Sequence, residues 1–248
     1  MNRIAALADK MLAQSNASSA KWNNVSTLKR RSASRILAPT EPPFASFAPM
    51  HYEAGYAYPL VIWLHGRAGN EHQLRRVMPH VSLRNFVAIA PRGTVQRRRG
   101  GFRWRQDTES IDEAEARIFH CVAAAGERFN IHPNRIFLAG SGCGGTMAVR
   151  VAWNHPDRFA GVASIGGPMP REFCPLHRVN DLRQLPCMIA MSRLSPTYPE
   201  VQVCRDLRLM HSAGCTVALR QYPGSDDLTT GMLSDLNGWL MELVCAGK

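Results

Sequence analysis

The sequence predicts an α/β fold built on a doubly wound, mostly parallel sheet. Short apolar runs alternate with segments of helical spacing from residue 58 to the end of the chain. Several of these runs end in loops that carry glycine or proline, as strands of a parallel sheet do. The length of 248 residues fits one such domain with an extension.

The individual elements follow from these patterns. We expect strands at 60–64, 87–90, 136–139, 161–165, 187–191 and 217–222. Helical spacing predicts helices at 111–129, 145–154, 201–213 and 232–244. Sites in such sheets lie at the carboxyl ends of the strands, so we expect a crevice walled by residues 65–70, 92–105, 140–145, 192–199 and 224–229.

One strand-to-helix turn carries the strongest functional signal. The predicted strand at 136–139 runs into Gly140-Ser141-Gly142-Cys143-Gly144-Gly145. A nucleophile elbow is written G-x-S-x-G, and the residues two before and two after the nucleophile must be small. Gly140 and Gly144 fill these places when Gly142 is the tip. The tip then has no side chain that could attack a carbonyl carbon.

From Tyr58 onward the chain resembles the carboxylesterase/phospholipase branch of the α/β-hydrolases, which includes the acyl-protein thioesterases. The stretches that carry the likeness are residues 60–71, 90–93 and 136–147. The resemblance implies an α/β-hydrolase domain over residues 46–248, preceded by a basic N-terminal extension over residues 1–45.

Matching the family motifs to this chain places the nucleophile at Gly142, the acid at Ser195 and the histidine at Asp226. All three positions of the catalytic triad are therefore changed. The base of an α/β-hydrolase comes last in chain order, yet no histidine follows His211. The resemblance also implies an oxyanion hole from the backbone N–H groups of Arg67 and Cys143, which do not depend on side-chain identity.

These changes lead to the hypothesis of a pseudoenzyme that acts by binding or assembly, so that the chain is not expected to be an enzyme. A first alternative is an active esterase or thioesterase with a displaced nucleophile, Cys143 or Ser141, because Ser141 to Gly145 satisfies the elbow pattern one residue out of register. A second alternative is a structural component whose basic extension docks onto an acidic partner.

Further residues near the expected crevice are candidates for binding an anionic small molecule or an acidic protein. His65 and Gly66 follow a strand, and the loop from Arg92 to Arg105 gathers six arginines together with Phe102 and Trp104. The competing interpretations are a turn kept for packing and a solvated, charged loop. The adjacent acids Asp226 and Asp227 suggest a turn, and no metal site or cofactor is predicted.

Charge and cysteine content bound the remaining possibilities. The formal net charge is +11, and residues 1–40 hold seven basic residues against one acid. This extension favours a solvated arm or an assembly contact over nucleic-acid binding, because no recognition motif accompanies it; apolar spacing over residues 4–12 also predicts a helix. The sequence has no apolar run of 18 residues, so no membrane span is predicted. Seven cysteines without a Cys-x-x-Cys pair predict reduced thiols and a cytoplasmic location.

Overall fold

The computed structural model describes residues 43–171 and 179–246. The predicted helix near the start of the chain and the basic extension therefore lie outside the described residues, as do Cys174 and His177. Residues Pro42–Lys248 belong to one compact unit. The division of the chain near residue 45 stays a prediction.

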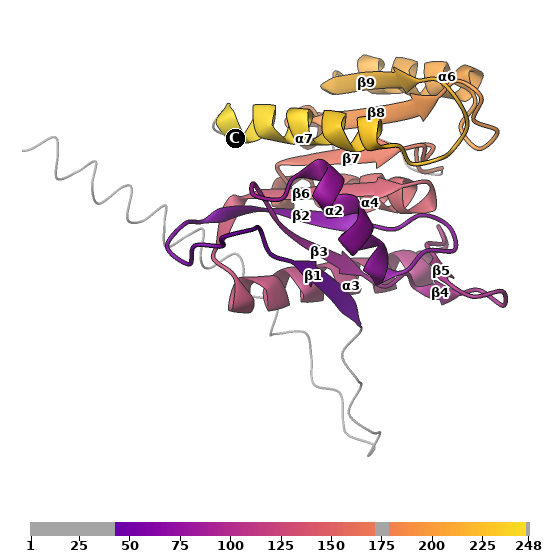
Figure 1. Ribbon diagram of the computed structural model, residues 1–248. Coiled ribbons are helices and arrows are strands. Elements are labelled where there is room, and N and C mark those ends of the chain that lie inside the picture. The colour runs from indigo at the N-terminus through magenta and orange to yellow at the C-terminus, as the bar shows by residue number, and fades with distance from the viewer. Residues whose placement is uncertain (1–42, 172–178, 247–248) are drawn as a thin grey trace, which may run out of the picture. The chain divides into compact units, whose positions relative to one another are not determined.

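A seven-stranded sheet forms the centre of this unit, in the order β1-β3-β2-β6-β7-β8-β9. Its strands are β1 (Phe44–Phe47), β2 (Tyr58–Leu64), β3 (Val87–Pro91), β6 (Ile131–Ser141), β7 (Gly161–Ile165), β8 (Cys187–Ser192) and β9 (Val217–Tyr222). Only β1 pairs antiparallel, and the other six strands are parallel. Figure 1 shows the sheet running from β1 at one edge to β9 at the other. The expected doubly wound, mostly parallel sheet is confirmed.

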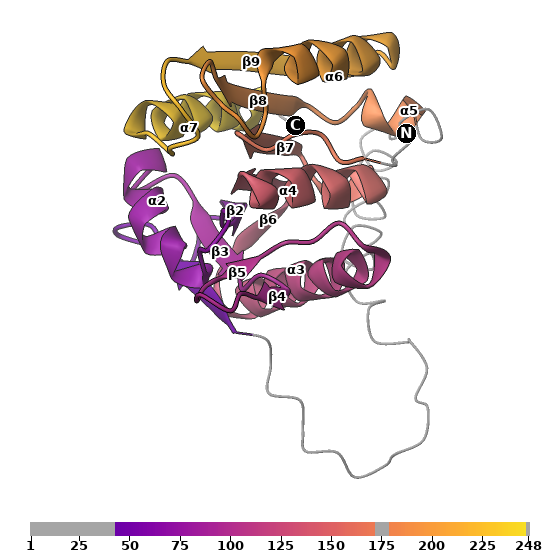
Figure 2. The ribbon, with the colours of Figure 1, turned by 90° about the vertical axis from the view of Figure 1, so that its right-hand side faces the viewer.

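Helices cover both faces of the sheet, as Figure 2 shows: α2 and α7 lie on one face, and α3, α4 and α6 on the other. The helices are α2 (Leu74–Val81), α3 (Thr108–Arg128), α4 (Cys143–Asn154), α5 (Val179–Leu182), α6 (Glu200–Ser212) and α7 (Thr230–Cys245), with single 3-10 turns η2 (Glu71–Gln73) and η3 (Pro156–Arg158). The side chains of Asp107 and Thr229 accept hydrogen bonds from backbone N–H groups of the first turns of α3 and α7, which fixes where these helices begin.

The central strands are apolar because both of their faces are covered. Every residue of β2, β3, β7 and β8 is buried. One core layer lies between the sheet and the face covered by α2 and α7, where Trp63 and Phe86 pack with Trp239 and Leu240. Burial of this kind contributes about 25 cal/mol per Å² of apolar surface, which makes it the main stabilising term of the fold.

Two elements in the first part of the described chain were not expected from sequence. The strand β1 adds to the edge of the sheet beside β3, and α2 follows η2 although it contains Pro79. The arginine-rich loop after β3 also has its own structure, because β4 (Val95–Gln96) and β5 (Phe102–Arg103) form an antiparallel hairpin. The backbone of this segment is a bonded hairpin, and four of its six arginines, Arg98, Arg99, Arg103 and Arg105, are exposed.

Parallel strands bring their following loops to one edge of the sheet, so the pairing registers place the expected crevice. Leu64 at the end of β2 pairs with Gly140 near the end of β6, and Ser141 pairs with Ile165 at the end of β7. Ser192 at the end of β8 pairs with Tyr222 at the end of β9. The loops that follow these strands and β3 carry most of the candidate site residues, while Ser141 ends β6 and Cys143 begins α4.

Candidate functional site

The turn after β6 has the backbone of a nucleophile elbow. Gly142 adopts φ 51° and ψ −124°, a region that favours glycine, and α4 begins at the next residue, Cys143. Two hydrogen bonds hold the tip, because Gly142 N donates to Ile165 O at 2.8 Å and Thr146 N donates to Gly142 O at 3.1 Å. The turn thus has a strained tip, and the residue at this tip is a glycine.

Steric space decides which residue of the turn can carry a side chain. A Cβ atom on Gly140 would lie 2.6 Å from the carbonyl carbon of Gly144, and one on Gly144 would lie 2.2 Å from Leu64 O. A Cβ atom on Gly142 would meet no atom within 4 Å. The flanking positions thus require glycine, whereas the tip faces open space. Gly142 holds the tip, and Cys143 is the first residue of the helix.

Ser141 and Cys143 flank the tip, and both carry nucleophilic side chains. Ser141 is buried and Cys143 is partly buried. Burial raises the pKa of its thiol, and this effect exceeds the opposite influence of nearby backbone N–H groups, including that of Trp104, and of the Arg67 charge. A raised pKa reduces the thiolate fraction at neutral pH, and the thiolate is the nucleophile. The helix N-terminus alone therefore does not activate this cysteine.

His65 is a fully buried histidine whose two ring nitrogens both have backbone partners. Gly93 N donates to Nε2 at 3.0 Å, and Nδ1 lies 2.8 Å from Gly66 O. Since Nε2 accepts, the proton of the neutral ring is assigned to Nδ1, which donates to the carbonyl. Burial lowers the pKa of this imidazole, against weaker effects of the Gly66 bond and the Glu71 charge. The ring joins two loops and has no free nitrogen for a substrate proton or a ligand.

The hairpin β4–β5 is bonded to the loop after β2. Ala68 N donates to Phe102 O at 3.0 Å, and Phe102 N donates to Gly69 O at 2.8 Å. The side chain of Trp104 is buried, and its Nε1–H donates to His65 O at 3.1 Å. Trp104 therefore packs and positions the loop, which is the role that the aromatic residues of this segment had in one of the two expected interpretations.

Arg92 is paired inside the protein. Its guanidinium binds both carboxylate oxygens of Glu71, with Nε 2.9–3.0 Å from them, and lies 4.9 Å from the centre of the Phe102 ring. Burial alone would raise the pKa of Glu71, but the bonds from Arg92 lower it. Arg92 thus anchors the start of the arginine-rich segment, while Arg103 in β5 is exposed. Sequence reasoning missed Glu71, because a single carboxylate in a polar loop has no motif.

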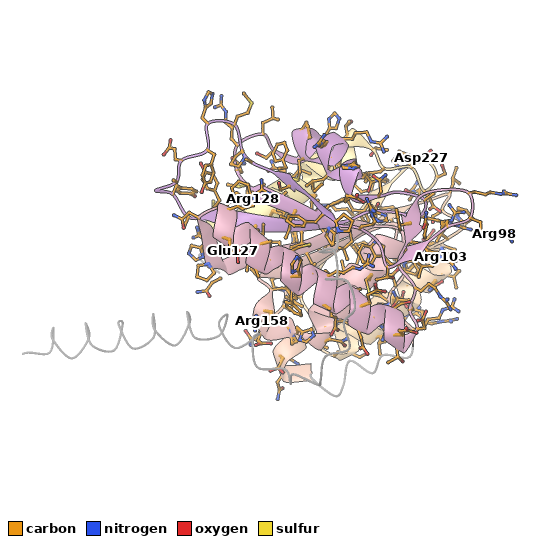
Figure 3. All side chains as sticks on the ribbon, turned by 90° about the horizontal axis from the view of Figure 1, so that it is seen from below. Arg98, Arg103, Glu127, Arg128, Arg158 and Asp227 are labelled. Atoms are coloured by element: carbon orange, nitrogen blue, oxygen red, sulfur yellow. The ribbon has the colours of Figure 1, made fainter. Side chains whose placement is uncertain are left out.

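The two remaining triad positions lie after β8 and β9. Ser195 is buried, and its hydroxyl accepts a hydrogen bond from Tyr198 N at 2.8 Å. Asp226 is exposed in the loop after β9, next to Asp227, which Figure 3 labels. Backbone bonds hold these two loops together, since Leu194 N donates to Gly224 O at 2.9 Å. Neither position supplies an imidazole or an acid that could hold one.

Histidines elsewhere in the described chain lie mostly away from this edge. His155 ends α4 and pairs with Glu115, with Nε2 and Oε2 3.0 Å apart, and His211 lies in the last turn of α6. Within residues 43–171 and 179–246, the loops after the parallel strands carry only His65 and His72. The ring of His72 is largely exposed, and its Nε2 lies 3.7 Å from Glu71 Oε1.

The two backbone N–H groups expected to form an oxyanion hole lie in loops that approach each other. A Cβ atom on Gly66 would lie 3.0 Å from Ser141 Oγ, which shows how closely the turn before Arg67 packs on the elbow. In the part of the chain that the structure describes, no backbone carbonyl accepts a bond from Arg67 N. The N–H of Cys143, in the first helical turn, has no intrahelical partner either. These are the two donors that the family resemblance assigns to an oxyanion hole.

Comparison with known proteins decides the family. The model of the esterase family, described as "Putative esterase", matches residues 37–204, which is more than half of the chain. The chain belongs to this esterase family. A further relative is the "Putative esterase NocK" of Nocardia uniformis subsp. tsuyamanensis, 30% identical over 120 residues, which are 45% of this chain and 33% of that protein. The esterase-family chain thus spans about a third of the length of this curated relative.

Solved structures show that the esterase-family chain has the α/β-hydrolase fold. The structure of YahD with malic acid matches with a TM-score of 0.65 and 16% identity, over 81% of this chain and 98% of that one. A carboxylesterase from Mesorhizobium loti matches with a TM-score of 0.64 and 19% identity, over 74% and 88% of the two chains. The Bacillus cereus carboxylesterase matches with a TM-score of 0.64 and 17% identity, over 81% and 93%.

Among the described residues, no group of three or more His, Cys, Asp or Glu side chains could hold a metal ion. None of the described helices is both long enough and apolar enough to span a bilayer.

Proposed function

We propose that this esterase-family protein is a pseudoenzyme, which binds an anionic small molecule at the carboxyl edge of its sheet and does not hydrolyse esters. The observation that carries the proposal is Gly142 at the tip of an intact elbow, with open space where a nucleophile would stand. Loss of a nucleophile lowers turnover by about a millionfold in a hydrolase, so residual activity stays near background.

The lack of an available base supports the same proposal. A serine or thiol nucleophile needs a group of near-neutral pKa to take its proton. The buried imidazole of His65 is bonded at both nitrogens, and Asp226 stands where the family has its histidine. Supplying a nucleophile alone therefore restores little activity.

The ligand class follows from the donors that remain. The N–H groups of Arg67 and Cys143 are suited to an oxyanion or a carboxylate, and the exposed side chain of Arg67 adds a positive charge near Cys143. The solved structure of YahD is one with malic acid, a dicarboxylate. We therefore propose a small carboxylate as the ligand and malate as the probe for the first test.

Binding is tested by calorimetric titration of the full chain with malate. Arg67→Ala is expected to weaken binding at least about fivefold, since it removes a charge beside the donors. Arg128→Ala is the matched control, because Arg128 is equally exposed and lies in α3, away from this edge (Figure 3). Equal affinities of the two variants, or no binding by the parent, would contradict the proposed ligand class.

Loss of hydrolysis is tested with p-nitrophenyl acetate and butyrate. The parent and Gly142→Ser are both expected to stay within about tenfold of the uncatalysed rate, because the variant supplies an oxygen without a base. Clear turnover by the parent would overturn the pseudoenzyme proposal.

The alternative of a displaced nucleophile rests on one observation, that the Cys143 thiol stands at a helix N-terminus among backbone N–H groups. If this alternative is correct, activity of the parent disappears in Cys143→Ala or, for the hydroxyl, in Ser141→Ala.

The docking alternative concerns the basic extension, and deletion of residues 1–40 tests it by loss of co-elution with an acidic partner. We also propose a reducing, cytoplasmic location, because the cysteines of the described chain are free.

A further inference from the structure

A long stretch of this chain is basic without interruption. Residues 72–106 contain nine arginines and no aspartate or glutamate. The middle of this stretch is the hairpin β4–β5, whose turn carries Arg97, Arg98 and Arg99 in succession. Arg97, Arg98 and Arg99 are not among the candidate residues of the crevice.

The hairpin presents these charges on a fixed backbone. Arg97 N donates to Gly101 O at 2.9 Å and Gly100 N donates to Arg97 O at 3.0 Å, so the turn is closed by its own bonds. Gly100 and Gly101 have φ angles of 88° and 71°, which glycine adopts without strain. The bonds from Phe102 to the loop after β2 then hold the base of the hairpin on the protein.

The alternation of the second strand separates its aromatic and basic side chains. Phe102 and Trp104 face the protein, where Arg92 covers the first and His65 O accepts a bond from the second. Arg103 and Arg105 alternate with them and are exposed. Alternate residues of an extended segment lie on one side of it, so Arg103 and Arg105 share the outer side, next to the turn that carries Arg97, Arg98 and Arg99. Figure 3 shows Arg98 and Arg103 at one end of the unit.

Ion pairs within the protein leave most arginines of the hairpin uncompensated. Arg92 pairs with Glu71, and Arg105 Nε lies 2.9 Å from Asp107 Oδ2. Over the described ranges 43–171 and 179–246, no salt bridge involves Arg97, Arg98, Arg99 or Arg103. Four guanidinium groups are therefore free to bind an anion outside the chain, and each can bind a phosphate through two hydrogen bonds.

We propose that the β4–β5 hairpin is a binding surface for the phosphate backbone of a nucleic acid. Several arginines spread over one hairpin suit a polymer with repeated anions, whereas a single small anion needs convergent groups. The large apolar side chains exposed on the described chain are Met50, Tyr56, Leu83, Leu194, Val201, Leu209 and Leu219, and none lies in the hairpin. A protein interface has an apolar centre, whereas a nucleic-acid interface is polar and positively charged.

The test is the binding of a labelled 20-base-pair DNA duplex to the full chain, followed by fluorescence anisotropy at several salt concentrations. Each phosphate contact contributes about 0.9 to the slope of log K against log salt. The triple variant Arg98→Ala/Arg99→Ala/Arg103→Ala is expected to reduce this slope by about 3 and to weaken binding at least about tenfold at low salt.

The matched control is Arg84→Ala/Arg205→Ala/Arg208→Ala, which removes the same charge from exposed positions outside the hairpin. It is expected to keep the slope of the parent within about 1, and the basic extension contributes equally to all three proteins. Equal losses in both triple variants, or no loss in the hairpin variant, would overturn the proposal. Hairpin-dependent binding of a labelled polyglutamate in place of the duplex would overturn it as well, in favour of an acidic protein.

Discussion

Gly142 lies at the tip of a sharp turn and has no side chain that could act as a nucleophile. Its backbone has the positive φ of a sharp elbow, and a Cβ atom there would meet no neighbour within 4 Å. A side chain at this position is opposed by backbone conformation and by nothing else. Glycine at the tip therefore avoids a strain of about 1–3 kcal/mol, which a residue with a side chain would carry in such a region.

This account predicts that Gly142→Ala lowers the free energy of unfolding by about 1–3 kcal/mol, measured by urea denaturation. Gly126→Ala is the control, since Gly126 lies in α3, has no positive φ and would meet no atom within 4 Å. That change is expected to stabilise the protein by about 0.5–1 kcal/mol. A Gly142→Ala protein as stable as the parent would show that the elbow is unstrained.

His65 is the second residue whose role is decided by its surroundings. It was a candidate binding residue of the crevice, yet its ring is buried and hydrogen-bonded to Gly66 and Gly93. Burial lowers its pKa below the ordinary value of 6.5, so the unfolded chain binds the proton more readily than the folded one. Its contribution to stability is complete above pH 6.5 and is lost as the pH falls toward the folded pKa.

We therefore expect the free energy of unfolding to fall between pH 7.5 and pH 5, and to fall less steeply in His65→Gln. The pKa of His132 is also lowered, by burial and by the charge of Arg135, so part of the slope remains in the variant. Denaturation curves at four pH values measure the difference in slope. Parallel pH dependences of the two proteins would mean that the His65 ring does not stay neutral on folding.

At the scale of elements, the loop after β8 retains its position through Tyr198. This residue is fully buried, its N–H bonds Ser195 Oγ, and its hydroxyl donates to Asp206 Oδ2 in α6 at 2.9 Å. Burial raises the pKa of Asp206, while the bond from Tyr198 opposes this shift. The loop to which the family resemblance assigns the acid is thus held by a phenol.

Removing this hydroxyl tests the anchor. Tyr198→Phe is expected to lower the free energy of unfolding by about 1.5–3 kcal/mol, because a half-buried carboxylate loses its donor. Tyr222→Phe is the matched variant, since Tyr222 donates to Asp235 at an exposed site, with a distance of 2.6 Å, and a loss below about 1 kcal/mol is expected. Similar losses in both variants would argue against a special role for Tyr198.

Elements with strong periodicity could be predicted from sequence, and short ones could not. The strands at 161–165 and 217–222 have the expected bounds. Strand β6 begins at Ile131, earlier than expected, because its first residues are polar and partly exposed. The hairpin β4–β5 has only two residues in each strand, although Gly100-Gly101 is a turn signal that sequence analysis can use.

At the scale of the whole molecule, the edge of the sheet that carries the site was predictable, but the contacts within it were not. The order of strands and loops fixes which loops meet, whereas the assignment of Gly142, Ser195 and Asp226 to the triad stays a prediction. Long-range pairs such as Glu71 with Arg92 depend on packing between loops that no local pattern encodes. Burial of His65 and Trp104 likewise follows from the hairpin, which sequence reasoning did not find.

The central claim is that no group of this protein attacks an acyl carbon, and intact mass spectrometry tests it most directly. The full chain and Cys143→Ala are incubated with p-nitrophenyl butyrate, with the urea-unfolded chain as the control for unspecific acylation. The account predicts that the folded parent gains no acyl group faster than the unfolded chain. A stoichiometric butyryl adduct on the folded parent, formed faster than on the unfolded chain, would contradict it.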